Sequence, residues 1–110
     1  MRIPTELRVK ALIRQCSAAG VPSVVARHGD PDAGILFVKI RLLDGRARLL
    51  GPEPPGRAAD DDLPRLAPHL DPDGAPEAAV DAYLARQIGF DSDLWLVEIE
   101  DRKGAGFLAD

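Results

Sequence analysis

Four basic side chains stand close together between residues 34 and 51 and are the clearest candidates for chemistry. The set comprises Lys39, Arg41, Arg46 and Arg48, with Arg27 from a neighbouring strand. Apolar residues alternate with the cations in a strand pattern, and Asp44-Gly45 is typical of a two-residue hairpin turn. With that turn Arg41 pairs with Arg48, and the cations gather on one face of a hairpin. We expect this basic sheet face to bind an anionic ligand or a partner protein.

Two other interpretations of these charges stay open. In the first, the cations are solvated and partly neutralised by Glu98 and Glu100, through surface pairs that contribute about 0–1 kcal/mol each. In the second, the face binds nucleic acid. RNA-binding sheets usually add exposed aromatic rings for base stacking, and the only aromatic residue nearby is Phe37. Nucleic acid is therefore favoured less than a protein or another anionic ligand.

A second candidate site is a loop that places one imidazole near two carboxylates. Its residues are His28, Asp30 and Asp32, and such groups can serve a metal-dependent hydrolase or nuclease. Their spacing in a proline turn does not match a specific metal-ligand motif, and Asp30 has a role in forming the turn. The loop is kept as the alternative functional site, and no catalytic residue or metal ligand is assigned.

Cys16 could act as a nucleophile, but it lies on the apolar stripe of a predicted helix, so we expect a small core residue. The chain contains no P-loop and no GxGxxG, CxxC or HExxH motif. Their absence argues against NTP, dinucleotide, zinc-finger and zincin chemistry. We therefore expect a binding module that needs no cofactor, rather than an enzyme.

Two helices and several strands are predicted to position these residues. Apolar spacing indicates helices over 7–19 and 77–88, with prolines suited to their first turns and Gly20 and Gly89 at their ends. Strands are expected at 23–28, in the two arms of the hairpin and at 94–100. In the last strand, alternation places Trp95, Val97 and Ile99 on one face. It places Glu98 and Glu100 on the other.

These elements predict one α+β domain over residues 1–110, with a small antiparallel sheet of about four or five strands and both helices packed on one face. The first three strands are expected to form an antiparallel meander. Residues 52–76 hold seven of the ten prolines, so 52–68 is predicted to be a mobile, acidic loop and 63–70 a short edge strand. The uncovered face would carry the charges toward a partner.

The charge of the chain is unevenly distributed. Residues 1–51 contain nine Lys or Arg against four Asp or Glu, whereas residues 52–110 contain five against fourteen. Such asymmetry can attract an anionic partner, neutralise itself on folding, or drive homo-oligomerisation. No segment has the pattern of a signal peptide or a membrane span, so a cytoplasmic location without a membrane partner is expected.

Three phrases of the chain, VVARHGDPDAGILFVKI, VDAYLARQ and FDSDLWLVEIEDR, resemble those of domain-of-unknown-function family 1491. The likeness covers most of the chain, and residues 52–68 are its least similar part. The resemblance implies a small, soluble, single-domain bacterial protein. It carries over no activity, cofactor or site residue.

Overall fold

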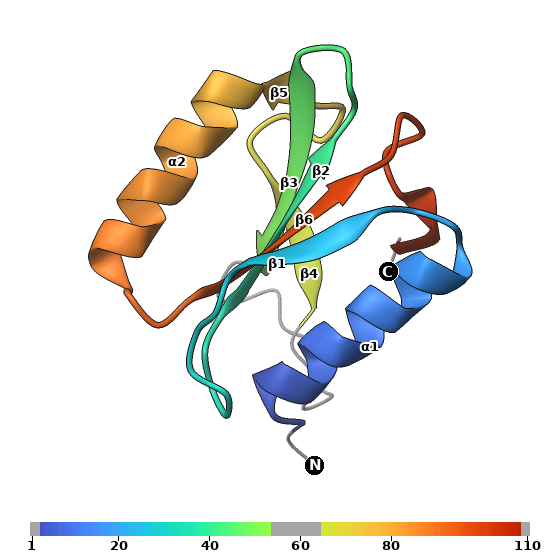
Figure 1. The fold of residues 1–110 in the computed structure, drawn as a ribbon. Helices are drawn as coiled ribbons and strands as arrows, with labels where there is room; N and C mark the ends of the chain where they lie inside the picture. The colour runs from blue at the N-terminus through green and yellow to red at the C-terminus, as the bar shows by residue number, and fades with distance from the viewer. Residues whose placement is uncertain (1–2, 54–64, 109–110) are drawn as a thin grey trace.

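The computed structural model describes residues 3–53 and 65–108, which form two α-helices, six strands and a 3-10 turn (Figure 1). The helical elements are α1 (Thr5–Ala18), α2 (Glu77–Phe90) and η1 (Gly106–Leu108). The strands are β1 (Ser23–Arg27), β2 (Leu36–Arg41), β3 (Arg46–Pro52), β4 (Leu66–His69), β5 (Ala75–Pro76) and β6 (Trp95–Glu100). The predicted α+β class is confirmed. Most of the predicted mobile loop, 54–64, lies outside the described residues.

The sheet is mixed, and the last strand of the chain is an interior strand of the sheet. The strand order is β1-β6-β2-β3-β4, with β5 pairing the start of β3. β6 runs parallel to β2 and antiparallel to β1. The prediction of a purely antiparallel sheet that begins with a three-strand meander is therefore wrong. The physical reason is burial. Five of the six residues of β6 are buried or half-buried, and they point to both faces of the sheet, which suits an interior strand.

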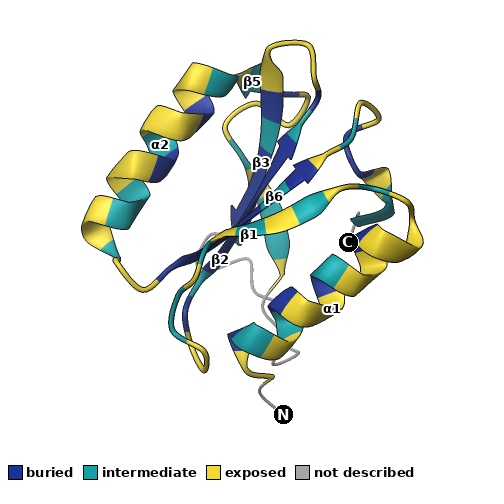
Figure 2. Ribbon diagram, in the orientation of Figure 1, coloured by how far each residue is buried: buried dark blue, intermediate teal, exposed yellow. Residues whose placement is uncertain are grey.

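The two helices cover opposite faces of the sheet, so the prediction that both pack on one face is also wrong (Figure 1). The α1 face holds Val9, Leu12, Cys16, Val38, Ile40, Trp95, Val97 and Ile99. The α2 face holds Phe37, Ala47, Leu49, Val80, Leu84, Leu94 and Leu96. Residues 36–40 of β2 are all buried, and alternate side chains of a strand point to opposite faces (Figure 2). A strand that is apolar on both faces needs cover on both.

The loop between β1 and β2 ties the start of α1 to the start of β6. The carbonyl oxygen of Asp32 accepts from the N–H of Thr5 at 3.1 Å, and the hydroxyl of Thr5 donates to the carbonyl of Gly34 at 2.6 Å. The bond to the N–H of Thr5 satisfies a backbone group at the helix N-terminus that has no partner inside the helix, and the N–H of Glu6 is satisfied likewise by the carbonyl of Pro31 at 2.9 Å. The indole of Trp95 donates to the carbonyl of Asp30 at 2.7 Å. The loop therefore connects α1 and β6 through hydrogen bonds.

Several finer predictions are confirmed. Trp95, Val97 and Ile99 share one face, and Cys16 is fully buried in the core beneath α1. Burial raises the pKa of its thiol. Strand β4 lies at the sheet edge and contains Pro68, where a missing N–H is tolerated. In the part of the chain that is described, neither fourteen-residue helix is long and apolar enough to cross a membrane.

Candidate functional site

The hairpin of β2 and β3 closes one residue away from the predicted register. Arg41 pairs with Ala47, and the N–H of Leu42 donates to the carbonyl of Arg46 at 3.0 Å, which leaves a loop of three residues, 43–45. This register turns Ala47 and Leu49 toward α2, where each is 1% exposed. The predicted pairing of Arg41 with Arg48 is wrong. In that register Ala47 and Leu49 would point away from α2, and the core beneath this helix would lose both side chains.

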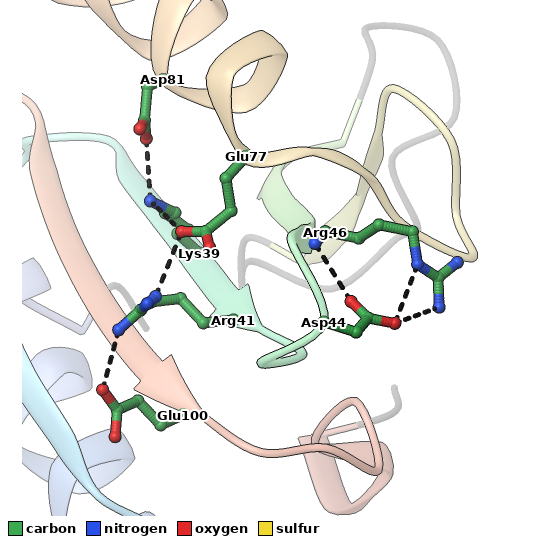
Figure 3. Close-up of polar contacts among 7 residues, drawn as sticks. All are labelled: Lys39, Arg41, Asp44, Arg46, Glu77, Asp81 and Glu100. Carbon is green, nitrogen blue, oxygen red and sulfur yellow. Dashed lines mark hydrogen bonds and ion pairs between the residues drawn. The ribbon is translucent and has the colours of Figure 1, made fainter.

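The shift divides the predicted basic face between the two sides of the sheet. Lys39 and Arg41 lie on the side of α2, because their partners Leu49 and Ala47 do. Arg46 and Arg48 lie on the other side, together with Leu42 and Leu50. Figure 3 shows Arg46 turned away from Lys39 and Arg41. The structure therefore does not bring the four cations together.

On the α2 side the cations meet carboxylates in what we call the α2 ion network. Its members are Lys39, Arg41, Glu77, Asp81 and Glu100 (Figure 3). The Nζ of Lys39 lies 2.8 Å from Asp81 and 3.2 Å from Glu77. Arg41 bridges Glu77 at 3.1 Å and Glu100 at 2.9 Å. Since β6 runs parallel to β2, Glu98 and Glu100 lie beside Lys39 and Arg41, as predicted from the alternation.

Lys39 is the most buried charge of this network, with only 6% of its side chain exposed. Burial alone lowers the pKa of a lysine. Here the hydrogen bonds to Asp81 and Glu77, with the charges of Asp81 and Glu98, outweigh burial and raise the pKa of Lys39. The ammonium group therefore stays charged and joins α2 to the sheet. It is not a nucleophile activated by a lowered pKa.

The other two cations of the hairpin belong to an open hollow of about 440 Å³, which we call the basic basin. Its cations are Arg46, Arg48, Arg102 and Lys103, and Leu42, Pro72, Asp73 and Gly104 complete its lining. The cations come from β3 and from the turn that follows β6. In residues 3–53 and 65–108, no carboxylate forms an ion pair with Arg48, Arg102 or Lys103. The basin therefore holds positive charge that the described residues leave unpaired.

Arg48 is held in place by two backbone carbonyls. Its Nε donates to the carbonyl of Pro72 at 2.8 Å, and its Nη1 donates to the carbonyl of Gly104 at 2.5 Å. Gly104 has φ of +77°, and a Cβ there would lie 3.4 Å from the Cδ of Arg48. Glycine accepts this left-handed conformation at no steric cost. The guanidinium is thus oriented by the two loops that flank it, and its charge is not cancelled.

The remaining basin cations have different contacts. The Nη1 of Arg46 donates to the carbonyl of Asp73 at 3.4 Å. Arg46 makes bonds of 3.1 and 2.9 Å to one carboxylate oxygen of Asp44. Arg102 and Lys103 are exposed, and the carboxylate of Asp101 shapes their turn by accepting from the N–H groups of Lys103 and Ala105. Sequence reasoning missed Arg102 and Lys103. The sequence shows two adjacent cations in a pattern typical of a turn, between Asp101 and Gly104, but only the strand order places Arg102 and Lys103 beside Arg48.

Arg27 lies away from the basin. It pairs with Leu96 at the beginning of β6, whereas the basin lies beyond the end of that strand. Its Nη2 donates to the carbonyl of Ser92 at 2.8 Å. Its Nε is buried and has no hydrogen-bond partner among the described residues. The structure therefore does not join Arg27 to the other predicted cations.

The alternative loop site is used mainly for structure. One carboxylate oxygen of Asp30 accepts from the backbone N–H of Asp32 at 3.2 Å and of Ala33 at 2.8 Å. The ring of His28 packs on Trp95, with 4.0 Å between centroids. Over the described ranges, no group of three or more His, Cys, Asp or Glu side chains is arranged to hold a metal ion.

Comparisons with known proteins extend over nearly the whole chain. The family described as "Protein of unknown function (DUF1491)" matches residues 3–109. The solution structure of protein Atu0922 from A. tumefaciens is 42% identical, covers 98% of this chain and 92% of that chain, and has a TM-score of 0.81. The crystal structure of a DUF1491 family protein from Caulobacter crescentus is 34% identical, covers 99% and 95%, and has a TM-score of 0.78. No curated protein matches the chain.

Proposed function

We infer a function from geometry, since this chain belongs to the DUF1491 family, whose description assigns no activity. We propose that it is a non-enzymatic binding module that holds an anionic ligand or the acidic part of a partner in the basic basin. The observation that supports this proposal is Arg48, whose guanidinium is held by two carbonyls beside Arg102 and Lys103 with no carboxylate partner in the described residues. A positive group kept in this way attracts anions.

The contacts of Arg48 also have a purely structural explanation, because its two hydrogen bonds join the loop at Pro72 to the turn at Gly104. That explanation does not need Arg102 or Lys103. Among the described residues neither side chain forms a hydrogen bond or an ion pair, yet both line the same hollow. A test through Arg102 and Lys103 therefore separates binding from stability.

The proposal is tested by NMR titration of arginine side chains with polyphosphate, an RNA oligomer and an acidic peptide at low salt. We expect shifts at Arg48 and Arg102 that weaken steeply as salt rises. The variant R102Q/K103Q should lose most of this binding. The control K10Q/R14Q removes the same charges from exposed positions of α1 and should keep it. Equal binding by both variants, or no shifts with any anion, would overturn the proposal.

A further inference from the structure

The basic basin differs from the other charged sites of the molecule in the geometry of the anion that it can bind. We infer that its ligand is a small phosphate ester with a hydroxylated, non-aromatic body, such as a sugar or polyol phosphate. This inference rests on the proposed function, because it specifies the ligand class for the same basin.

The molecule shows how its arginines meet planar carboxylates. The guanidinium of Arg46 directs two bonds to one oxygen of Asp44, and Arg41 contacts one oxygen each of Glu77 and Glu100. In each case one or two cations are enough for the carboxylate. Arg46 also lines the basin, where the other three cations have no carboxylate partner among the described residues. A planar carboxylate needs no more than one such guanidinium.

The basin instead surrounds a volume with cations. Arg46 and Arg48 approach it from β3, and Arg102 and Lys103 approach it from the turn after β6. A phosphate group carries up to two charges near neutral pH and presents three acceptor oxygens in different directions. It can therefore bond to several of these cations at once. A carboxylate of the same charge cannot place its oxygens around one centre in this way.

The rest of the lining specifies the body of the ligand. The described residues that line the basin include no aromatic ring, so base stacking, which contributes much of the binding to nucleobases, is not available. Asp73 is the single acidic member of that lining, and its carboxylate can accept hydrogen bonds from ligand hydroxyls. The volume of about 440 Å³ lies in the range of small-molecule sites.

The experiment compares two small dianions that both carry a hydroxyl group, glycerol 3-phosphate and malate, by calorimetry and NMR at low salt. We expect glycerol 3-phosphate to bind at least about tenfold more tightly, with shifts at Arg48 and Arg102. AMP, which adds an aromatic base, should bind no more tightly than glycerol 3-phosphate. The variant R48K keeps the charge but loses the fork and should reduce phosphate affinity at least about fivefold.

Variant R102Q/K103Q serves as a second test, since its exposed positions should leave folding intact, and K10Q/R14Q is its matched control. Equal affinity for malate and glycerol 3-phosphate would overturn the phosphate inference and leave the binding module standing. Tighter binding of AMP would overturn the non-aromatic body. Binding of polyphosphate but of neither small dianion would overturn the small-ligand class. Loss of all anion binding would overturn the proposed function itself.

Discussion

The α2 ion network and the basic basin take their cations from the same hairpin, yet they use them in opposite ways. Lys39 is buried beneath α2, Arg41 is half-buried beside it, and together they contact three acidic side chains, Glu77, Asp81 and Glu100. Arg48, on the next strand, is bonded to carbonyls and faces an open hollow. Because a shift of one residue in the register moves every side chain of a strand to the other face, neighbouring cations acquire different roles.

The largest effect should come from removing the buried cation of the α2 ion network. Lys39→Met leaves Asp81 without an ion-pair partner among the described residues and Glu77 with Arg41 alone, and should lower the free energy of unfolding by about 2–3 kcal/mol. The estimate is reduced because both carboxylates keep some contact with water. Lys103→Met makes the same chemical change in the basin and should cost less than about 0.5 kcal/mol. Urea unfolding of both variants measures the difference, and equal losses would contradict it.

Unfolding at alkaline pH tests the role of Lys39 in the α2 ion network separately. The carboxylates that raise the pKa of Lys39 above its ordinary value make the folded state bind this proton more tightly than the unfolded state. The resulting stabilisation is complete below about pH 10.4 and is lost as the pH rises through the folded pKa. Above about pH 10.4, the protein should therefore lose more unfolding free energy than Lys39→Met does. Parallel curves would show that Lys39 is not linked to stability.

A smaller effect is expected at the turn that orients Arg48. Gly104→Ala places a Cβ on a residue with φ of +77° and should destabilise the fold by about 1–2 kcal/mol. The matched change Gly106→Ala meets no atom within 4 Å and should be nearly neutral. Thermal unfolding and the NMR signal of the Arg48 side chain test both variants. Identical behaviour of the two would show that the turn does not hold Arg48.

The smallest change in stability should follow Asp44→Asn. The asparagine oxygen can still accept from the N–H of Arg46, so the turn is kept, but the ion pair to the Arg46 guanidinium is lost. The denaturant midpoint should not move measurably, because exposed pairs contribute little. Anion affinity of the basin should rise about two- to threefold as Arg46 becomes available. A fall in affinity would show that the basin needs Arg46 held by Asp44.

Sequence alone predicted the parts of the fold that depend on alternation. It placed Glu98 and Glu100 beside Lys39 and Arg41, and Trp95 on the face opposite them, because strand side chains alternate wherever the strand lies. The hairpin register was not predictable, since Asp44-Gly45 is compatible with loops of two or three residues. The observed loop also holds Leu43 at φ of 64°, a conformation that leucine rarely adopts.

The candidate site was predicted only in part, for a reason that lies in the topology. Arg46 and Arg48 stand in the hairpin and were visible as a cluster, but Arg102 and Lys103 lie more than fifty residues further along the chain. They meet because β6 inserts beside β2, and neither composition nor periodicity specifies which strands are neighbours. A site assembled by strand order becomes visible only in three dimensions.

The insertion of β6 also determines when the protein can fold as it is synthesised. Among the described strands, β1 pairs with β6 and with no other, so residues 23–27 have no strand partner until residues 95–100 have been made. Until residues 95–100 have emerged from the ribosome, β1 and β2 both present open edges. Pairing over such sequence separations forms slowly and leaves apolar surface exposed meanwhile. The edges of β1 and β2 are therefore open to pairing with other chains until β6 has been made.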